Sequence, residues 1–262
     1  MNELFGKMLG LPVLASEHGA KVDQLIIYVH YLMAALFVGW ILYFIYVLLR
    51  FNSKANPKAD YVGIRSHASN YIELAVALIE GVLLLGFAVP MWARAVDSGT
   101  FPTPDQHPVT IHVVAQQFAW NVFYPGPDGV FAKRDISLVS TDNPWGIDQN
   151  DPNGKDDFAP IQNQIHCVVG KPVVVILNSK DVIHSFKVIA MRVTQDAIPG
   201  VTIPIHFVPT KVGVYQINCA QLCGVGHASM SGGRIFVDTQ EDYDKWFAGQ
   251  AKAASTSAKS FE

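Results

Sequence analysis

Two long and almost purely apolar runs fill most of the first hundred residues. The first extends from Leu25 to Phe51 with a single histidine inside it, and the second extends from Tyr71 to Trp92. About 20 consecutive apolar residues are enough to cross the hydrocarbon core of a bilayer. We therefore predict two transmembrane helices, over about 25–51 and 71–96. A buried helical hairpin of a soluble protein is the alternative.

The segment that connects the two runs is basic. It contains Arg50, Lys54, Lys58, Arg65 and His67, and Asp60 is its one acidic residue. By the positive-inside rule such a short loop stays in the cytoplasm. Both termini, and all that follows the second span, are then predicted on the periplasmic side of a bacterial inner membrane. We expect residues 1–24 to be an uncleaved leader, with a weak signal peptide as the alternative.

After Asp97 the pattern changes to short runs of β-branched and aromatic residues, separated by turns rich in Pro, Gly and Asn. Such runs are typical of a Greek-key sandwich or barrel. The runs expected as strands are Val109–Val114, Asp135–Val139, Gln164–Val169, Val173–Asn178, Ser185–Ile189, Ile203–Val208, Gly213–Asn218 and Gly233–Val237. The predicted organisation is a leader (1–24), a transmembrane hairpin (25–96), a β-sandwich (97–240), and a C-terminal helix followed by a disordered tail (241–262).

Composition and charge fit a membrane-anchored protein and give no sign of a nucleic-acid partner. Half of the chain is hydrophobic, and its formal net charge is only -3. Residues 97–262 hold 16 acidic and 12 basic residues, a balance that favours a basic partner. The Asp-rich segment from Thr141 to Phe158 is expected to be a solvated loop. A calcium loop is the weaker alternative, because the spacing misses the EF-hand pattern.

Metal-binding residue types are concentrated in twelve positions late in the chain, namely Cys219, Cys223, His227 and Met230. Thiolate and thioether ligands select copper, zinc or iron–sulfur, and a methionine beside a histidine favours copper. A zinc site has no use for methionine, and the C-x-x-C-H motif of a c-type haem is absent. Two thiolates can bridge two copper ions, each of which then needs a histidine. His227 supplies one, and we expect His184 to supply the other.

In this order, the two-span hairpin, His184 and the Cys219–Met230 segment resemble subunit II of haem–copper oxygen reductases of the cytochrome c oxidase type. The resemblance covers about Leu25 to Phe247. It implies a cupredoxin-like Greek-key sandwich that holds a dinuclear copper A (CuA) centre. The implied ligands are Cys219 and Cys223 as bridges, His184 and His227 with one copper each, Met230 as a weak axial ligand, and the backbone carbonyl of Gln221.

The same resemblance implies a function within an oxidoreductase and translocase complex. The chain would accept electrons at CuA from cytochrome c, or from a cytochrome bound in the complex, and pass them to haem a of subunit I. Oxygen would be reduced to water in subunit I, at haem a3 and CuB, and the other partners would be subunit III and membrane lipid. Three rival classes are a copper-free quinol oxidase subunit, nitrous oxide reductase and a single-copper carrier. The complete set of copper ligands argues against the quinol oxidase subunit. The chain is too short for nitrous oxide reductase, and the second cysteine argues against a single-copper carrier.

Two positions, Gln221 and Phe118, depart from the family pattern. Where this chain has Gln221, the family commonly has a glutamate whose carboxylate reaches a magnesium ion. An amide is a weaker ligand for that cation, so magnesium binding is left as an open question here. Phe118 replaces a tryptophan where electrons enter, and Trp120 follows it. We hypothesise an altered donor contact here, with core packing as the alternative. Glu73 matches a glutamate at the entrance of a proton channel, or it snorkels to the membrane surface. Nothing carries over to Glu80.

Overall fold

The computed structural model describes residues 2–58, 61–63 and 65–259, and it divides into two compact units. The first unit comprises Met1–Leu11 and Lys21–Arg94. The second comprises Pro12–Ala20 and Ala95–Glu262. Asp60, the acidic residue of the basic loop, lies outside the described residues.

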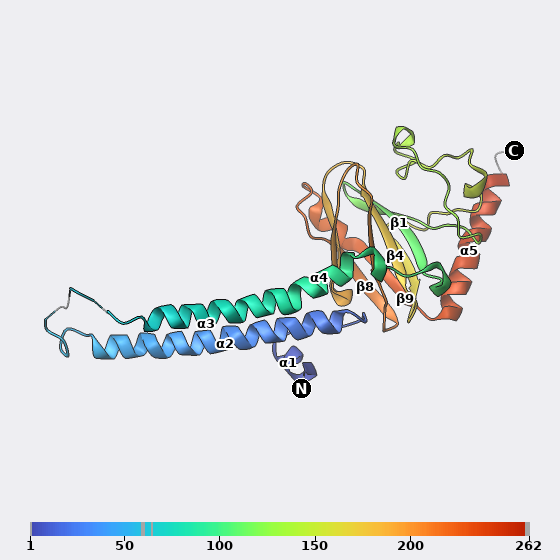
Figure 1. The fold of residues 1–262 in the computed structure, drawn as a ribbon. Helices are drawn as coiled ribbons and strands as arrows, with labels where there is room; N and C mark the ends of the chain where they lie inside the picture. Colours follow the sequence, from blue (N-terminus) through green and yellow to red (C-terminus); the bar gives the residue numbers. More distant parts are fainter. Residues whose placement is uncertain (1, 59–60, 64, 260–262) are drawn as a thin grey trace. The chain divides into compact units, whose positions relative to one another are not determined.

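The regular elements described in the first unit are helices. They are α1 (Asn2–Met8), α2 (Gly19–Arg50), α3 (Ala68–Leu83), the π-helical turn η1 (Leu84–Ala88) and α4 (Val89–Val96). α2 and α3 run side by side in opposite directions (Figure 1). The two candidate spans have mean hydropathies of 2.4 and 2.3, and their most apolar windows contain no buried residue. The core of a soluble protein would bury these side chains, so the two predicted spans are confirmed and the alternative is wrong.

Among the described residues, nine strands form the two sheets of a sandwich in the second unit (Figure 1). The first sheet has the order β2 (Ala119–Phe123), β1 (Val109–Gln116), β4 (Val173–Ser179), β7 (Ile203–Phe207). The second has the order β3 (Gln164–Val168), β9 (Gly233–Asp238), β8 (Gly213–Cys219), β5 (His184–Val188), β6 (Val193–Ala197). Their inward residues, such as Val113, Val175, Phe186 and Ile235, form one buried core. The predicted cupredoxin-like sandwich is confirmed.

The strand predictions fail at three places. Asp135–Val139 is not a strand, because the Asp135 side chain accepts a 2.8 Å hydrogen bond from the Ser137 N–H and starts a 3-10 turn at Ile136–Leu138. Ile136 is 80% exposed, so its apolar character marks no core position. β2 and β6 were not predicted. All five residues of β2 are buried, which removes the alternation expected of a strand, and β6 carries polar residues in its middle.

The segment Thr141–Phe158 is a loop with one short 3-10 turn, as expected. Its Asp151 accepts hydrogen bonds from the backbone N–H groups of Lys133 and Asn153. Arg134, just before the segment, donates from Nη1 to His112 Nδ1 over 2.7 Å and from Nε to the Trp145 carbonyl over 2.8 Å. Asp151 thus connects the loop to the segment before it, and Arg134 ties the loop to β1.

Both ends of the chain contribute to the second unit. Part of the expected leader packs on the sandwich, where Ala15 is fully buried and its N–H donates to the Ala190 carbonyl over 2.8 Å. At the other end, α5 (Gln240–Lys259) stacks Trp246 on His166, with ring centroids 4.1 Å apart. The helix continues through 255–259, where an unstructured tail was expected, and 260–262 lie outside the described residues.

Candidate metal centre

Neighbouring strands bring the upstream histidine to the cysteine loop. β5 pairs with β8 in antiparallel register, so that Phe186 lies opposite Cys219. The N–H of Ala220 donates to the Ser185 carbonyl over 2.9 Å, which extends this pairing past the strand end. His184, the first residue of β5, is therefore held at the start of the loop that follows β8. Its side chain is fully buried.

All the predicted ligand atoms meet in one cluster. The two thiol sulfurs of Cys219 and Cys223 are 3.9 Å apart, and the Cys223 sulfur lies 3.4 Å from His227 Nδ1. The sulfur of Met230 is 3.5 Å from the Cys223 sulfur and 3.2 Å from His184 Nδ1. The Gln221 carbonyl oxygen is 3.1 Å from the Cys219 sulfur. Among the described residues, His184, Cys219 and Cys223 form a group whose ligand atoms all lie within 4.8 Å of one another.

The spacing of the two sulfurs fits metals shared between them. A metal–thiolate bond is about 2.3 Å long, so one ion can bind both sulfurs of a pair that is 3.9 Å apart. Two ions that shared both sulfurs would each need further ligands. His184 Nδ1 and the Met230 sulfur, which lie 3.2 Å apart, would complete the ligands of one ion. His227 and the Gln221 carbonyl would remain for the other. The donor set therefore fits a dinuclear copper site.

The imidazole of His184 is oriented by a carboxylate. Its Nε2–H donates to Asp181 Oδ1 over 2.9 Å, which leaves the Nδ1 lone pair facing the sulfurs. Asp181 Oδ2 also accepts the backbone N–H of Gln117 over 2.7 Å. Burial raises the pKa of Asp181, but hydrogen bonds from Gln117, His184 and Val182 outweigh it and hold that pKa below its usual value.

A second set of contacts holds the loop from the other side. The Gln117 side-chain amide donates to the Cys223 carbonyl over 2.6 Å. The ring of Phe118 lies against Gly224 and Gly226, so close that a Cβ on Gly226 would overlap it. The indole N–H of Trp120 donates to the Met230 carbonyl over 3.0 Å. The loop is therefore held at three points by the segment 117–120.

The two aromatic residues predicted where electrons enter lie in different settings. Trp120 is fully buried, and its ring centroid is 5.5 Å from that of Phe186 and 6.3 Å from that of His184. This is the core packing that stood as the alternative. Phe118 is only partly buried and touches the loop between Cys223 and His227.

Burial and the neighbouring Cys219 raise the pKa of the Cys223 thiol to about 11. Cys223 is thus a thiol at neutral pH, and it has to lose its proton when a metal binds. The third cysteine is different in kind, because Cys167 is fully buried in β3 with its sulfur 3.6 Å from the Phe236 carbonyl. It lies outside the metal cluster and is a matched control for it.

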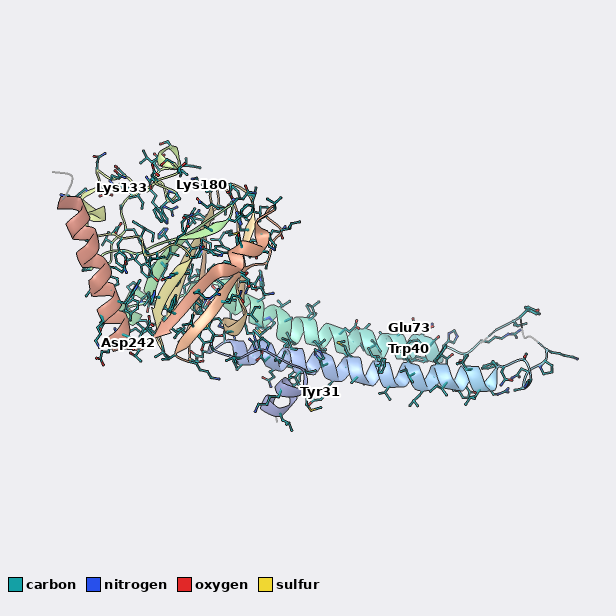
Figure 2. All side chains as sticks on the ribbon, turned by 180° about the vertical axis from the view of Figure 1, so that it is seen from behind. Tyr31, Trp40, Glu73, Lys133, Lys180 and Asp242 are labelled. Carbon is teal, nitrogen blue, oxygen red and sulfur yellow. The ribbon has the colours of Figure 1, made fainter. Side chains whose placement is uncertain are left out.

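Two of the predicted side chains, those of Glu73 and Gln221, are not part of this cluster. Glu73 lies on α3 in the first unit, with an exposed side chain (Figure 2). The side chain of Gln221 is exposed, although its carbonyl joins the cluster. Conversely, the supporting roles of Asp181 and Gln117 were not predicted from the sequence. Asp181 had a local signal, an acidic residue three positions before His184. Gln117 had none, since it lies 106 residues from its partner Cys223.

Comparisons with known proteins agree on one family. A family model described as cytochrome c oxidase subunit II, periplasmic domain, matches residues 109–237. Cytochrome c oxidase subunit 2 of Cyanidium caldarium is 30% identical over 213 residues, which cover 80% of this chain and 77% of that protein. Alternative cytochrome c oxidase subunit 2 of Bradyrhizobium diazoefficiens is 29% identical over 241 residues, covering 91% and 83%.

A solved structure is also similar to part of this chain. It is the periplasmic domain of subunit II of cytochrome oxidase of Bradyrhizobium japonicum, at 26% identity and a TM-score of 0.40. The match covers 55% of this chain and 94% of that chain.

Proposed function

This chain belongs to the cytochrome c oxidase subunit II family, and we propose that it is the subunit through which electrons enter its haem–copper oxidase. The main support for this proposal is the cluster of two thiols, two imidazoles, a thioether and a carbonyl from Cys219–Met230 and His184. A quinol oxidase subunit has no use for such a set. The proposed ligands are those predicted from the sequence, with Cys219 and Cys223 as the bridges.

When bound, a copper pair that shares two thiolates would supply a one-electron carrier. The residues of this chain keep that site rigid. β5 and Asp181 fix His184, β8 fixes Cys219, and the segment 117–120 holds the loop by two hydrogen bonds and one ring contact. The side chains of His184, Cys223 and Met230 are buried, so these ligands are shielded from water. A site held in this way needs little rearrangement when an electron arrives or leaves.

For the remaining steps we propose the arrangement that the family implies. A cytochrome c, or a cytochrome tethered to the complex, gives an electron near Phe118, and haem a of subunit I receives it for oxygen reduction there. The acidic balance of residues 97–262 steers a basic donor to the domain. Glu73 serves proton uptake on the cytoplasmic side of the inner membrane, and the copper domain faces the periplasm. The neutral amide of Gln221 weakens any magnesium site shared with subunit I.

Electron uptake is tested by mixing the copper-loaded complex with reduced cytochromes in a stopped-flow instrument. The proposal expects bleaching of the copper absorption as the cytochrome is oxidised. If no cytochrome reduces the copper, the proposed function is wrong. The altered contact at Phe118 predicts slow reduction by a soluble cytochrome c and faster reduction by a membrane-anchored one. Fast, salt-sensitive reduction by the soluble protein would contradict that part alone.

A further inference from the structure

A hollow lies between the two transmembrane helices of the first unit. Its volume is about 340 Å³, and its lining includes Val29, Leu32 and Met33 of α2 with Glu80, Leu83 and Leu84 of the second span. We call this hollow the Glu80 groove. Glu80 is the one charged residue among those that line it. The copper centre and the family resemblance leave this residue without a role.

Glu80 lies deep in the membrane. It is 12 residues from the start of the second span at Ala68 and 16 residues from its end at Val96. At a rise of about 1.5 Å per residue, these separations are about 18 Å and about 24 Å along the helix. The hydrocarbon core is about 30 Å thick, so the carboxyl group is near its middle. From there a glutamate side chain is too short to reach either surface.

A carboxyl group at this depth needs a polar partner. Ionisable groups in transmembrane segments are costly, and they almost always face other protein or a water-filled cavity. Within the described residues, the side chain of Glu80 takes part in no hydrogen bond or ion pair. Lipid chains offer no donor. Water is a poor substitute, because an ordered water needs two to four polar partners and the rest of the lining is apolar.

The backbone around Glu80 leaves room for another helix. A Cβ placed on the adjacent Gly81 would meet no atom within 4 Å. The π-helical turn Leu84–Ala88 begins one turn later, and such turns often mark functional places in helices. Small residues at the surface of a span allow a second backbone to approach closely. A second backbone therefore has room to approach the span at Gly81, next to Glu80.

We propose that the Glu80 groove seats a transmembrane helix of another subunit of the oxidase, and that this helix brings an N–H or O–H donor to the Glu80 carboxyl group. The partner is a helix and not a lipid, because only a protein segment supplies both an apolar surface and a donor at this depth. The proposal rests on assembly of the chain into an oxidase and not on the copper centre. Loss of one is therefore separable from loss of the other.

Photo-crosslinking in the intact membrane tests the occupant. A benzophenone amino acid is placed at Leu84, which lines the groove, or at Leu85, which does not. These leucines are neighbours of similar exposure, 57% and 70%. We expect protein adducts in excess from position 84 and lipid adducts in excess from position 85. Lipid adducts alone from position 84, or equal protein yields from both positions, would overturn the proposal.

Substitutions at Glu80 test the donor. We expect Glu80→Leu to lower the retention of the other subunits in detergent by about threefold to tenfold, the range for one hydrogen bond between transmembrane helices. Glu80→Gln keeps an acceptor oxygen and is expected to retain them. A loss in both variants would identify the donor as a cation. Full retention in Glu80→Leu would overturn the proposal. The copper content of both variants should stay unchanged, and a parent complex without copper would count against the proposed function instead.

Discussion

The two units of this chain use apolar residues in opposite ways. In the sandwich, residues such as Phe186 and Ile217 are fully buried in the core between the chain's own two sheets. In the helical unit, residues such as Leu84 and Leu85 point outward, and none in the most apolar windows is buried. The apolar residues therefore form a buried core in the sandwich. In the helical unit they form an exposed surface that lipid or another protein has to cover. The metal cluster lies in the sandwich, the unit that has its own core.

The largest expected effect separates the two kinds of apolar residue directly. Phe186→Ala should lower the free energy of unfolding of the sandwich by about 3–5 kcal/mol, because it leaves a cavity in the core. Leu85→Ala should change it by less than about 0.5 kcal/mol, because that side chain is not in a core. Denaturant unfolding in detergent, followed by fluorescence, measures both. Equal effects would break the comparison.

The contact of Phe118 with the loop sharpens the account of the sandwich. Gly226→Ala should destabilise it by about 1–3 kcal/mol, because the new methyl group overlaps the Phe118 ring. Gly232→Ala is the control, since a Cβ there meets nothing within 4 Å. Adding Phe118→Ala to Gly226→Ala should recover part of the loss. Thermal unfolding of these variants and of Phe118→Ala alone decides this, and additive effects in the double variant would contradict the contact.

Asp181 should tune metal binding without being a ligand. Asp181→Asn should weaken copper binding by about 10–100-fold, the usual range for groups that orient a metal-binding histidine. Asp196→Asn is the control, because that residue is exposed on the neighbouring β6. Competition with a copper chelator gives the affinities. An unchanged affinity in Asp181→Asn would show that β5 alone positions His184.

The smallest expected effect is an acid dependence in the sandwich. Burial first, and Arg134 second, lower the pKa of His112 to about 3. Between these two pKa values the unfolded chain, with a histidine pKa of about 6.5, binds a proton at this residue and the folded chain does not. The free energy of unfolding is therefore highest above pH 6.5 and falls as the pH decreases toward 3, by about 1–2 kcal/mol at pH 5. His112→Gln should remove this part of the pH dependence in unfolding measurements. An unchanged pH dependence would contradict it.

The sequence predicts most of this arrangement where the information is local. The two spans follow from two apolar runs, and four side-chain ligands lie within twelve residues of one another. What it misses depends on tertiary contacts. β2 is hidden because both of its faces are covered, and Ile136 suggests a strand although its side chain is solvated. The hydrogen bond from the Gln117 side chain to the Cys223 carbonyl joins segments that are far apart in the sequence, so no residue spacing predicts it.

The copper content of the full-length chain in detergent, with its EPR spectrum, tests the central claim most directly. The full chain is required because residues 12–20 pack on the sandwich. We expect two copper ions per chain and one unpaired electron shared between them, with more hyperfine lines than a single copper gives. Cys223→Ser should abolish this spectrum, and Cys167→Ser should preserve it. One copper with a four-line spectrum, or an unchanged spectrum in Cys223→Ser, would contradict the account.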